Sequence, residues 1–128
     1  MIVDTSAVLA ILFGEPEADA FTLKIARAAR PRLSAVSCLE AAIRVDRLNN
    51  PVASAALDEL LARLRLALEP VTAEQAYLAR AAYRTYGKSF HPAALNLGDC
   101  FAHALSKAMG ESLLSKGADF GWTDVARC

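Results

Sequence analysis

The chain begins Met1-Ile2-Val3-Asp4-Thr5-Ser6, a short apolar run that ends in an acid followed by two hydroxyl side chains. An α/β protein presents an acid in this way where a buried strand reaches the carboxyl edge of its sheet, and ligands of open α/β sheets bind at that edge. A charge at the end of a buried strand also needs a partner to offset its burial. Asp4 is therefore the first candidate for a functional residue.

Short apolar runs alternate with helical patterns along the rest of the chain. Further strands are predicted at residues 32–36, 67–71 and 112–115. Helices are predicted between them, and the clearest carries the amphipathic stripe Leu57, Leu60, Leu61 and Leu64. This alternation predicts an α/β fold with a central, mainly parallel sheet that is flanked by helices on both faces. Residues 1–128 contain no repeat or linker and are predicted to form one domain.

Three more acids stand at comparable places in the predicted elements: Glu40, Asp99 and Asp119. In a right-handed parallel sheet, the strand ends and the starts of the following helices gather on one edge, so these acids are expected to converge with Asp4. Clustered carboxylates repel one another unless a cation offsets their charge, and hard oxygen ligands favour Mg²⁺ or Mn²⁺. Such an ion polarises a phosphoryl oxygen and lowers the pKa of its bound water, which suits phosphodiester hydrolysis.

Each of these three acids also has a purely structural interpretation. Ser37-Cys38-Leu39-Glu40 matches a capping box in which Ser37 is the N-cap of a helix and Glu40 is its third residue. Asp99 would interact favourably with the macrodipole at the start of its helix. Asp119 would form a turn beside Gly117. From the residues alone, the metal site and these local roles both stay open.

Four segments carry a family resemblance, in the same order and over nearly the whole chain. They are Met1-Ile-Val-Asp4-Thr-Ser-Ala, Ser34-Ala-Val-Ser-Cys-Leu-Glu40-Ala, Asn96-Leu-Gly-Asp99-Cys-Phe-Ala and Lys116-Gly-Ala-Asp119-Phe-Gly-Trp-Thr-Asp124-Val. Together they resemble the PIN-domain family, and more specifically the VapC-type ribonuclease toxins of bacterial type II toxin–antitoxin systems. The fold that this resemblance implies is a PIN-like α/β/α sandwich.

The resemblance implies a metal-dependent endoribonuclease that uses Mg²⁺ or Mn²⁺ to hydrolyse RNA. Asp4 and Asp99 would be the principal metal ligands. Glu40 would complete the acidic cluster, either directly or through water. Asp119 is preferred as the fourth acid over Asp124, because it follows the last predicted strand more closely.

Two further polar residues lie one helical turn beyond predicted site residues. His103 follows Asp99 by four residues and so shares its helix face, where a partly solvated surface histidine is expected. Arg44 follows Glu40 by the same interval and would pair with it in the absence of a metal.

The resemblance also implies partners: a small VapB-like antitoxin protein and a second copy of the chain. The apolar helices near Phe21 and Leu60 are candidates for the homodimer interface. The net charge is zero, so no overall basic field attracts RNA.

The chain has no signal-peptide pattern and no apolar run of about 20 residues. With three cysteines in unpaired spacing, this predicts a cytoplasmic protein. The alternative function is a catalytically silent PIN-fold module that binds proteins, although such a module has no reason to retain Asp4, Glu40 and Asp99.

Overall fold

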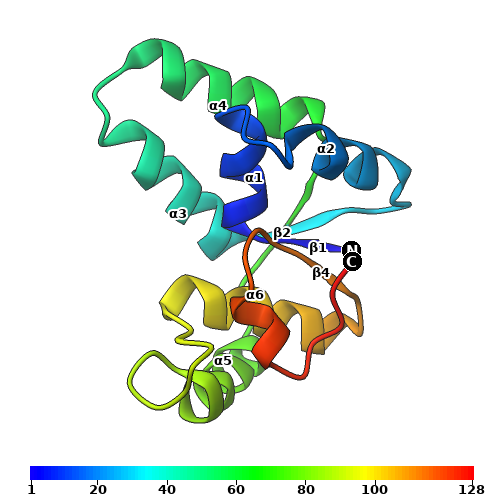
Figure 1. Ribbon diagram of the computed structural model, residues 1–128, viewed down its shortest axis with the longest axis vertical. Helices are drawn as coiled ribbons and strands as arrows, with labels where there is room; N and C mark the ends of the chain where they lie inside the picture. Colours follow the sequence, from blue (N-terminus) through cyan, green and yellow to red (C-terminus); the bar gives the residue numbers. More distant parts are fainter.

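The computed structural model describes residues 1–128 and has a four-stranded parallel sheet at its centre (Figure 1). The strands are β1 (Ile2–Val3), β2 (Arg32–Ser34), β3 (Ala67–Glu69) and β4 (Leu113–Leu114). Their order in the sheet is β3-β2-β1-β4, and every pair is parallel. The first strand of the chain is therefore an interior strand, with β2 on one side and the last strand, β4, on the other.

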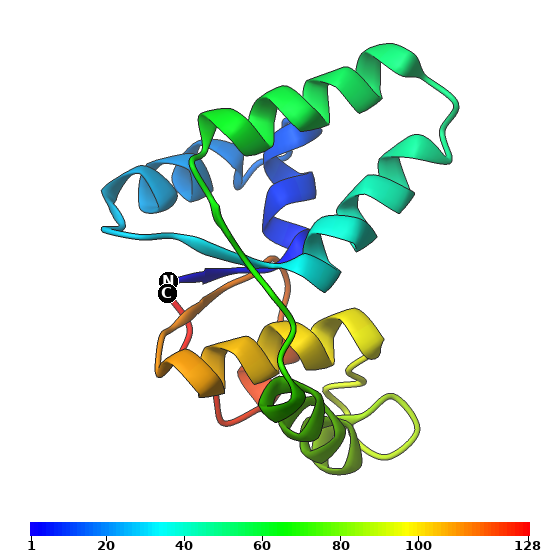
Figure 2. The same ribbon diagram turned by 180° about the vertical axis from the view of Figure 1, so that it is seen from behind.

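Helices cover both faces of this sheet, which confirms the predicted α/β/α sandwich (Figures 1 and 2). One layer holds α1 (Thr5–Leu12), α2 (Ala18–Arg27), α3 (Ala35–Asp46) and α4 (Pro51–Arg63). The other holds α5 (Ala73–Tyr86), α6 (Leu97–Met109) and the 3₁₀ helix η1 (Asp119–Trp122). None of the helices combines the length and the apolar character that crossing a membrane requires.

The short interior strands supply side chains to both layers, because successive residues of a strand point to opposite faces. In β1, Val3 packs in the core beneath α1–α4, whereas Ile2 packs in the core beneath α5 and α6. The neighbouring strand β4 repeats this division with Leu114 and Leu113. All four side chains are fully buried, and burying each contributes about 1.5–3 kcal/mol. The end of β1, where Asp4 follows, is thereby fixed from both sides.

The second strand ends at Ser34, two residues earlier than predicted, and this changes how α3 begins. Ser34 is the last residue of β2 in register with β3, and its hydroxyl accepts a hydrogen bond from the backbone N–H of Val36 at 3.2 Å. Ser34 is therefore the N-cap of α3, and the predicted capping box at Ser37 is wrong. Glu40 lies in the second turn of the helix, where its carboxylate has no capping role.

The helices proposed as a dimer interface direct their central residues inward. Phe21 of α2 and Leu60 of α4 are buried in the core beneath α1–α4. These two side chains pack in the chain's own core. That the helices around them supply a homodimer interface stays a prediction.

Candidate active site

Asp4 follows β1 and is the N-cap of α1, with only 4% of the residue exposed. Its carboxylate oxygen Oδ2 accepts hydrogen bonds from the backbone N–H of Ser6 at 2.9 Å and from the Ser6 hydroxyl at 2.6 Å. The backbone of Thr5 also favours the ionised carboxylate. No side chain donates a hydrogen bond to the other oxygen, Oδ1, so Ser6 fixes the side chain through one oxygen.

Asp99 is held in a similar way at the start of α6. Its Oδ2 accepts a hydrogen bond from the backbone N–H of Asn96 at 3.0 Å, and the Asn96 side chain accepts one from the backbone N–H of Asp99 at 2.9 Å. This reciprocal pair is a capping box, so the structural role expected for Asp99 at a helix start is present. Capping uses only one carboxylate oxygen, and Oδ1 remains free.

Glu40 approaches Asp99 from the neighbouring helix, since the starts of α3 and α6 face each other beyond the end of β1 (Figures 1 and 2). The Glu40 carboxylate lies against Gly98, and a Cβ at position 98 would overlap its Oε2. The predicted ion pair with Arg44 does not form, and Glu40 is in no other ion pair. Its carboxylate therefore lies against the first turn of α6, where its charge raises the pKa of Asp99, and is not neutralised on its own helix.

Asp119 joins these acids, whereas Asp124 is engaged elsewhere. Asp119 is the first residue of η1, and its charge raises the pKa of Asp99. The Asp124 carboxylate lies 2.8 Å from Nε2 of His103 and accepts a hydrogen bond from Nζ of Lys107 at 2.9 Å. Of the two acids that the tail offers, Asp119 is the one whose charge acts on Asp99.

His103 is buried, so the expectation of a partly solvated surface histidine is wrong. The chain after η1 lies along α6 and places Asp124 over the imidazole. Burial lowers the pKa of His103, and the hydrogen bond with Asp124 only partly opposes this effect. Its Nε2 faces Asp124, so His103 contributes to holding the tail on α6.

The four acids Asp4, Glu40, Asp99 and Asp119 form one electrostatic unit, which we term the acidic cluster. Burial raises the pKa of Asp99 to about 6, and repulsion from Asp4, Glu40 and Asp119 adds to the shift. Burial likewise raises the pKa of Asp4, with Glu40 adding to it. No lysine or arginine forms an ion pair with any of the four. The cluster therefore carries negative charge that the protein itself does not compensate.

The chemistry of the acidic cluster fits a hard divalent cation, because every donor is a carboxylate oxygen. No three His, Cys, Asp or Glu side chains are grouped closely enough to enclose an ion on their own. Mg²⁺ commonly binds one or two carboxylates and keeps several of its waters. Asp4 and Asp99, two carboxylates without a protein cation, match that mode of binding.

The hydroxyl residues after Asp4 tie together the segments that carry the acids. The hydroxyl of Ser6 accepts a hydrogen bond from the backbone N–H of Lys116 at 2.9 Å, which links α1 to the turn after β4. The Thr5 hydroxyl donates to the backbone carbonyl of Ser37 at 3.0 Å, which links α1 to α3. The positions of Glu40 and Asp119 relative to Asp4 thus depend on this pair.

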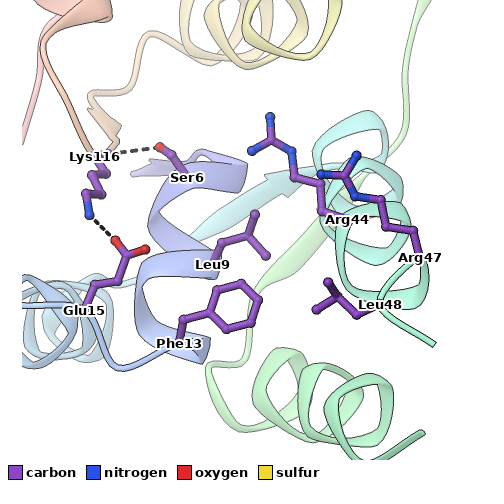
Figure 3. Close-up of a pocket in the computed structure, with 8 residues that line it drawn as sticks. All are labelled: Ser6, Leu9, Phe13, Glu15, Arg44, Arg47, Leu48 and Lys116. Carbon is purple, nitrogen blue, oxygen red and sulfur yellow. Dashed lines mark hydrogen bonds and ion pairs between the residues drawn. The ribbon is translucent and has the colours of Figure 1, made fainter. Parts of the chain in front are cut away.

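A pocket opens beside the acidic cluster, between α1 and α3 (Figure 3). Its volume is about 370 Å³. Ser6, the residue that holds Asp4, forms part of its wall. Arg44 and Arg47 lie on the α3 side, and Leu9 and Phe13 lie between them and the opposite wall (Figure 3).

Sequence reasoning overlooked two features of this region. Gly98 allows Glu40 to approach α6, and the signal was a glycine in the first turn of a helix, where it is unfavourable without a packing reason. Arg47 does not stand out in the sequence, because it is one of 14 lysines and arginines. Its signal was position: residues 40, 44 and 47 recur at i, i+4 and i+7, which places them on one helix face.

Comparisons with known proteins agree with this fold. The family model of the PIN domain matches residues 1–126. The chain is 52% identical to ribonuclease VapC28 of Mycobacterium tuberculosis over 128 residues, which covers 99% of this chain and 96% of that protein. It is 45% identical to a ribonuclease VapC of Mycolicibacterium smegmatis, with 98% of each chain covered.

A solved structure has the same fold at much lower sequence identity. M. tuberculosis VapC20, described as a sarcin-ricin loop cleaving toxin, superposes with a TM-score of 0.76 at 17% identity, covering 99% of this chain and 97% of that one. The chain therefore belongs to the PIN-domain family, and within it to the VapC ribonucleases.

Proposed function

We propose that this protein is a Mg²⁺- or Mn²⁺-dependent endoribonuclease toxin whose active site is the acidic cluster. The observation that carries the proposal is the convergence of four carboxylates from four separate segments, with no protein cation paired to any of them. The ribonuclease names of relatives with up to 52% identity support RNA as the substrate class.

In this proposal Asp4 and Asp99 would hold the cation. When bound, Mg²⁺ or Mn²⁺ would polarise a phosphoryl oxygen and make water more acidic. Ser6 keeps Asp4 oriented, and the Asn96 capping box keeps Asp99 oriented. Glu40 has no protein donor on its carboxylate, so it is available to accept the proton of the attacking water.

The test compares RNA cleavage by the wild type and by Asp4→Asn, with Mg²⁺, with Mn²⁺ and with EDTA. We expect the substitution or EDTA to slow cleavage at least about 100-fold, equivalent to roughly 2.7 kcal/mol of activation free energy. Mn²⁺ binding by Asp4→Asn, measured by electron paramagnetic resonance, should be weaker than binding by the wild type. Equal cleavage by both proteins, or cleavage that survives EDTA, would refute the metal-nuclease assignment. Metal binding without cleavage of any RNA would favour the catalytically silent module.

The proposal includes a small VapB-like antitoxin as the partner that neutralises the nuclease. Its support is the similarity to a solved VapBC2 complex from Rickettsia felis, described as bound to a DNA fragment from their promoter, with a TM-score of 0.71 at 15% identity and coverage of 94% and 89%. The homodimer stays a prediction, and light scattering on the purified chain would test it.

A further inference from the structure

We propose that the pocket between α1 and α3 binds the RNA nucleotide next to the scissile phosphate, with Arg44 and Arg47 on phosphate oxygens and Phe13 against the base. This inference rests on the proposed ribonuclease function and names where its substrate lies. It concerns residues outside the acidic cluster.

The first support is continuity between the pocket and the acidic cluster. Ser6 lines the pocket and also donates its hydroxyl hydrogen bond to Asp4. On the other wall, Glu40, Arg44 and Arg47 share one face of α3, one and two turns apart. An RNA strand that reaches the acidic cluster from this side must pass the guanidinium groups of Arg44 and Arg47 first.

The second support is uncompensated positive charge. Neither Arg44 nor Arg47 forms an ion pair or a side-chain hydrogen bond, and both are exposed. Lys116, on the opposite side of the pocket, is already paired with Glu15 (Figure 3). In a chain of zero net charge, two free guanidinium groups beside a cluster of acids provide a local contact for phosphate.

The third support is the apolar surface between the walls. Leu9 forms a buried base, while Phe13 and Leu48 are 51% and 54% exposed. Figure 3 shows the Phe13 ring lying between α1 and the α3 side, below the two arginines. Single-stranded RNA is held by aromatic and arginine side chains that stack on unpaired bases. The volume of about 370 Å³ lies within the range of small-ligand sites, roughly 300–1,000 Å³.

Binding is measured separately from cleavage by placing all variants in the Asp4→Asn background. The probe is a fluorescently labelled 12-nucleotide single-stranded RNA, and its anisotropy is followed from about 50 to 200 mM salt. Arg44→Gln combined with Arg47→Gln should weaken binding at least tenfold. It should also reduce the slope of log K against log salt by about 0.7 for each lost phosphate contact. Phe13→Ala should weaken binding at least about fivefold without changing that slope.

Arg80→Gln is the matched control, because Arg80 is an exposed arginine on α5, in the other helix layer. It should leave affinity unchanged, and circular dichroism should show that every variant is folded. Wild-type affinity and salt slope in the Arg44 and Arg47 double variant would overturn the proposal even if the enzyme cleaves RNA normally. Unchanged RNA binding with loss of binding to an acidic peptide would assign the pocket to a protein partner and overturn it too. Failure of the wild type to cleave RNA would instead refute the ribonuclease function.

Discussion

Glu40 and Gly98 come from different helices, yet the carboxylate of Glu40 occupies the space in which a side chain at position 98 would begin. Gly98→Ala should therefore push the Glu40 carboxylate away from Asp99 while leaving the fold intact, because the overlapping atoms are the far end of a flexible side chain. Alanine is also favoured over glycine in a helix by up to about 1 kcal/mol. We expect equal or higher thermal stability together with a roughly tenfold or greater loss of RNA cleavage.

Gly121→Ala is the control for that experiment, because its Cβ would meet only the flexible Arg127 side chain, at 3.3 Å. This variant should cleave RNA at the wild-type rate. If Gly98→Ala did the same, the close approach of Glu40 would have no catalytic importance.

The raised pKa of Asp99 predicts that the metal-free protein loses stability as pH rises. The folded protein holds this proton up to about pH 6, whereas the ordinary value is 3.8. Between these two pH values, Asp99 takes up a proton when the protein folds. The free energy of unfolding therefore falls as pH increases from about 4 to 6. In EDTA, urea unfolding at pH 7 should give a smaller free energy than at pH 5, with Asp99 contributing on the order of 1–3 kcal/mol.

Asp99→Asn should remove this contribution and stabilise the metal-free protein at pH 7. Asp58→Asn, an exposed aspartate on α4, provides the matched control. Mn²⁺ should stabilise the wild type more than Asp99→Asn, because a ligand that binds only the native state adds to its stability. An identical pH dependence of the free energy of unfolding in wild type and Asp99→Asn would contradict a raised pKa of Asp99.

Substitutions of Asp119 and Asp124 should have opposite effects on RNA cleavage and on stability. Asp119→Asn should lower RNA cleavage and Mn²⁺ affinity with little change in stability, because its side chain is exposed and makes no hydrogen bond. Asp124→Ala should do the reverse, since it removes the partner of His103 and Lys107 and costs about 1–3 kcal/mol. Cleavage rates and thermal unfolding of both variants are the measurements. Loss of cleavage in Asp124→Ala but not in Asp119→Asn would show that Asp124 is the fourth acid of the site.

Ser6→Ala tests whether the hydroxyl that holds Asp4 matters for catalysis. It removes a donor to Asp4 and the acceptor of the Lys116 N–H. We expect a loss of roughly 1 kcal/mol in stability and a loss of cleavage of about 10–100-fold, the range for residues that orient metal ligands. Ser37→Ala is the control, because the Ser37 hydroxyl is buried without a hydrogen-bond partner. Equal cleavage by both variants would show that Asp4 needs no such support.

Much of the acidic cluster can be predicted from patterns of neighbouring residues in the sequence. The strand ahead of Asp4 is apolar and short, and Asn96 and Asp99 have the spacing of a cap. The rule for parallel sheets then places acids from distant segments on one edge. These features depend on neighbouring residues and on the order of strands and helices, so they can be predicted from the sequence.

The errors arose where contacts distant in sequence decide between two local possibilities. Ser34 and Ser37 both suit an N-cap, and pairing with β3 decides where the strand stops. His103 looks like a surface residue until the C-terminal segment covers it with Asp124. No periodicity in α6 reports that a tail more than twenty residues later will lie over it.

The interior position of β1 has a consequence for when the enzyme becomes active. One neighbour of β1 is β4, at Leu113–Leu114, and the acidic cluster draws on residues from Asp4 to Asp119. During synthesis, β1 cannot pair with β4, the last of the four strands, until that strand has been made. A cluster of acids built in this way stays incomplete until Asp119 has left the ribosome, however early Asp4 is made.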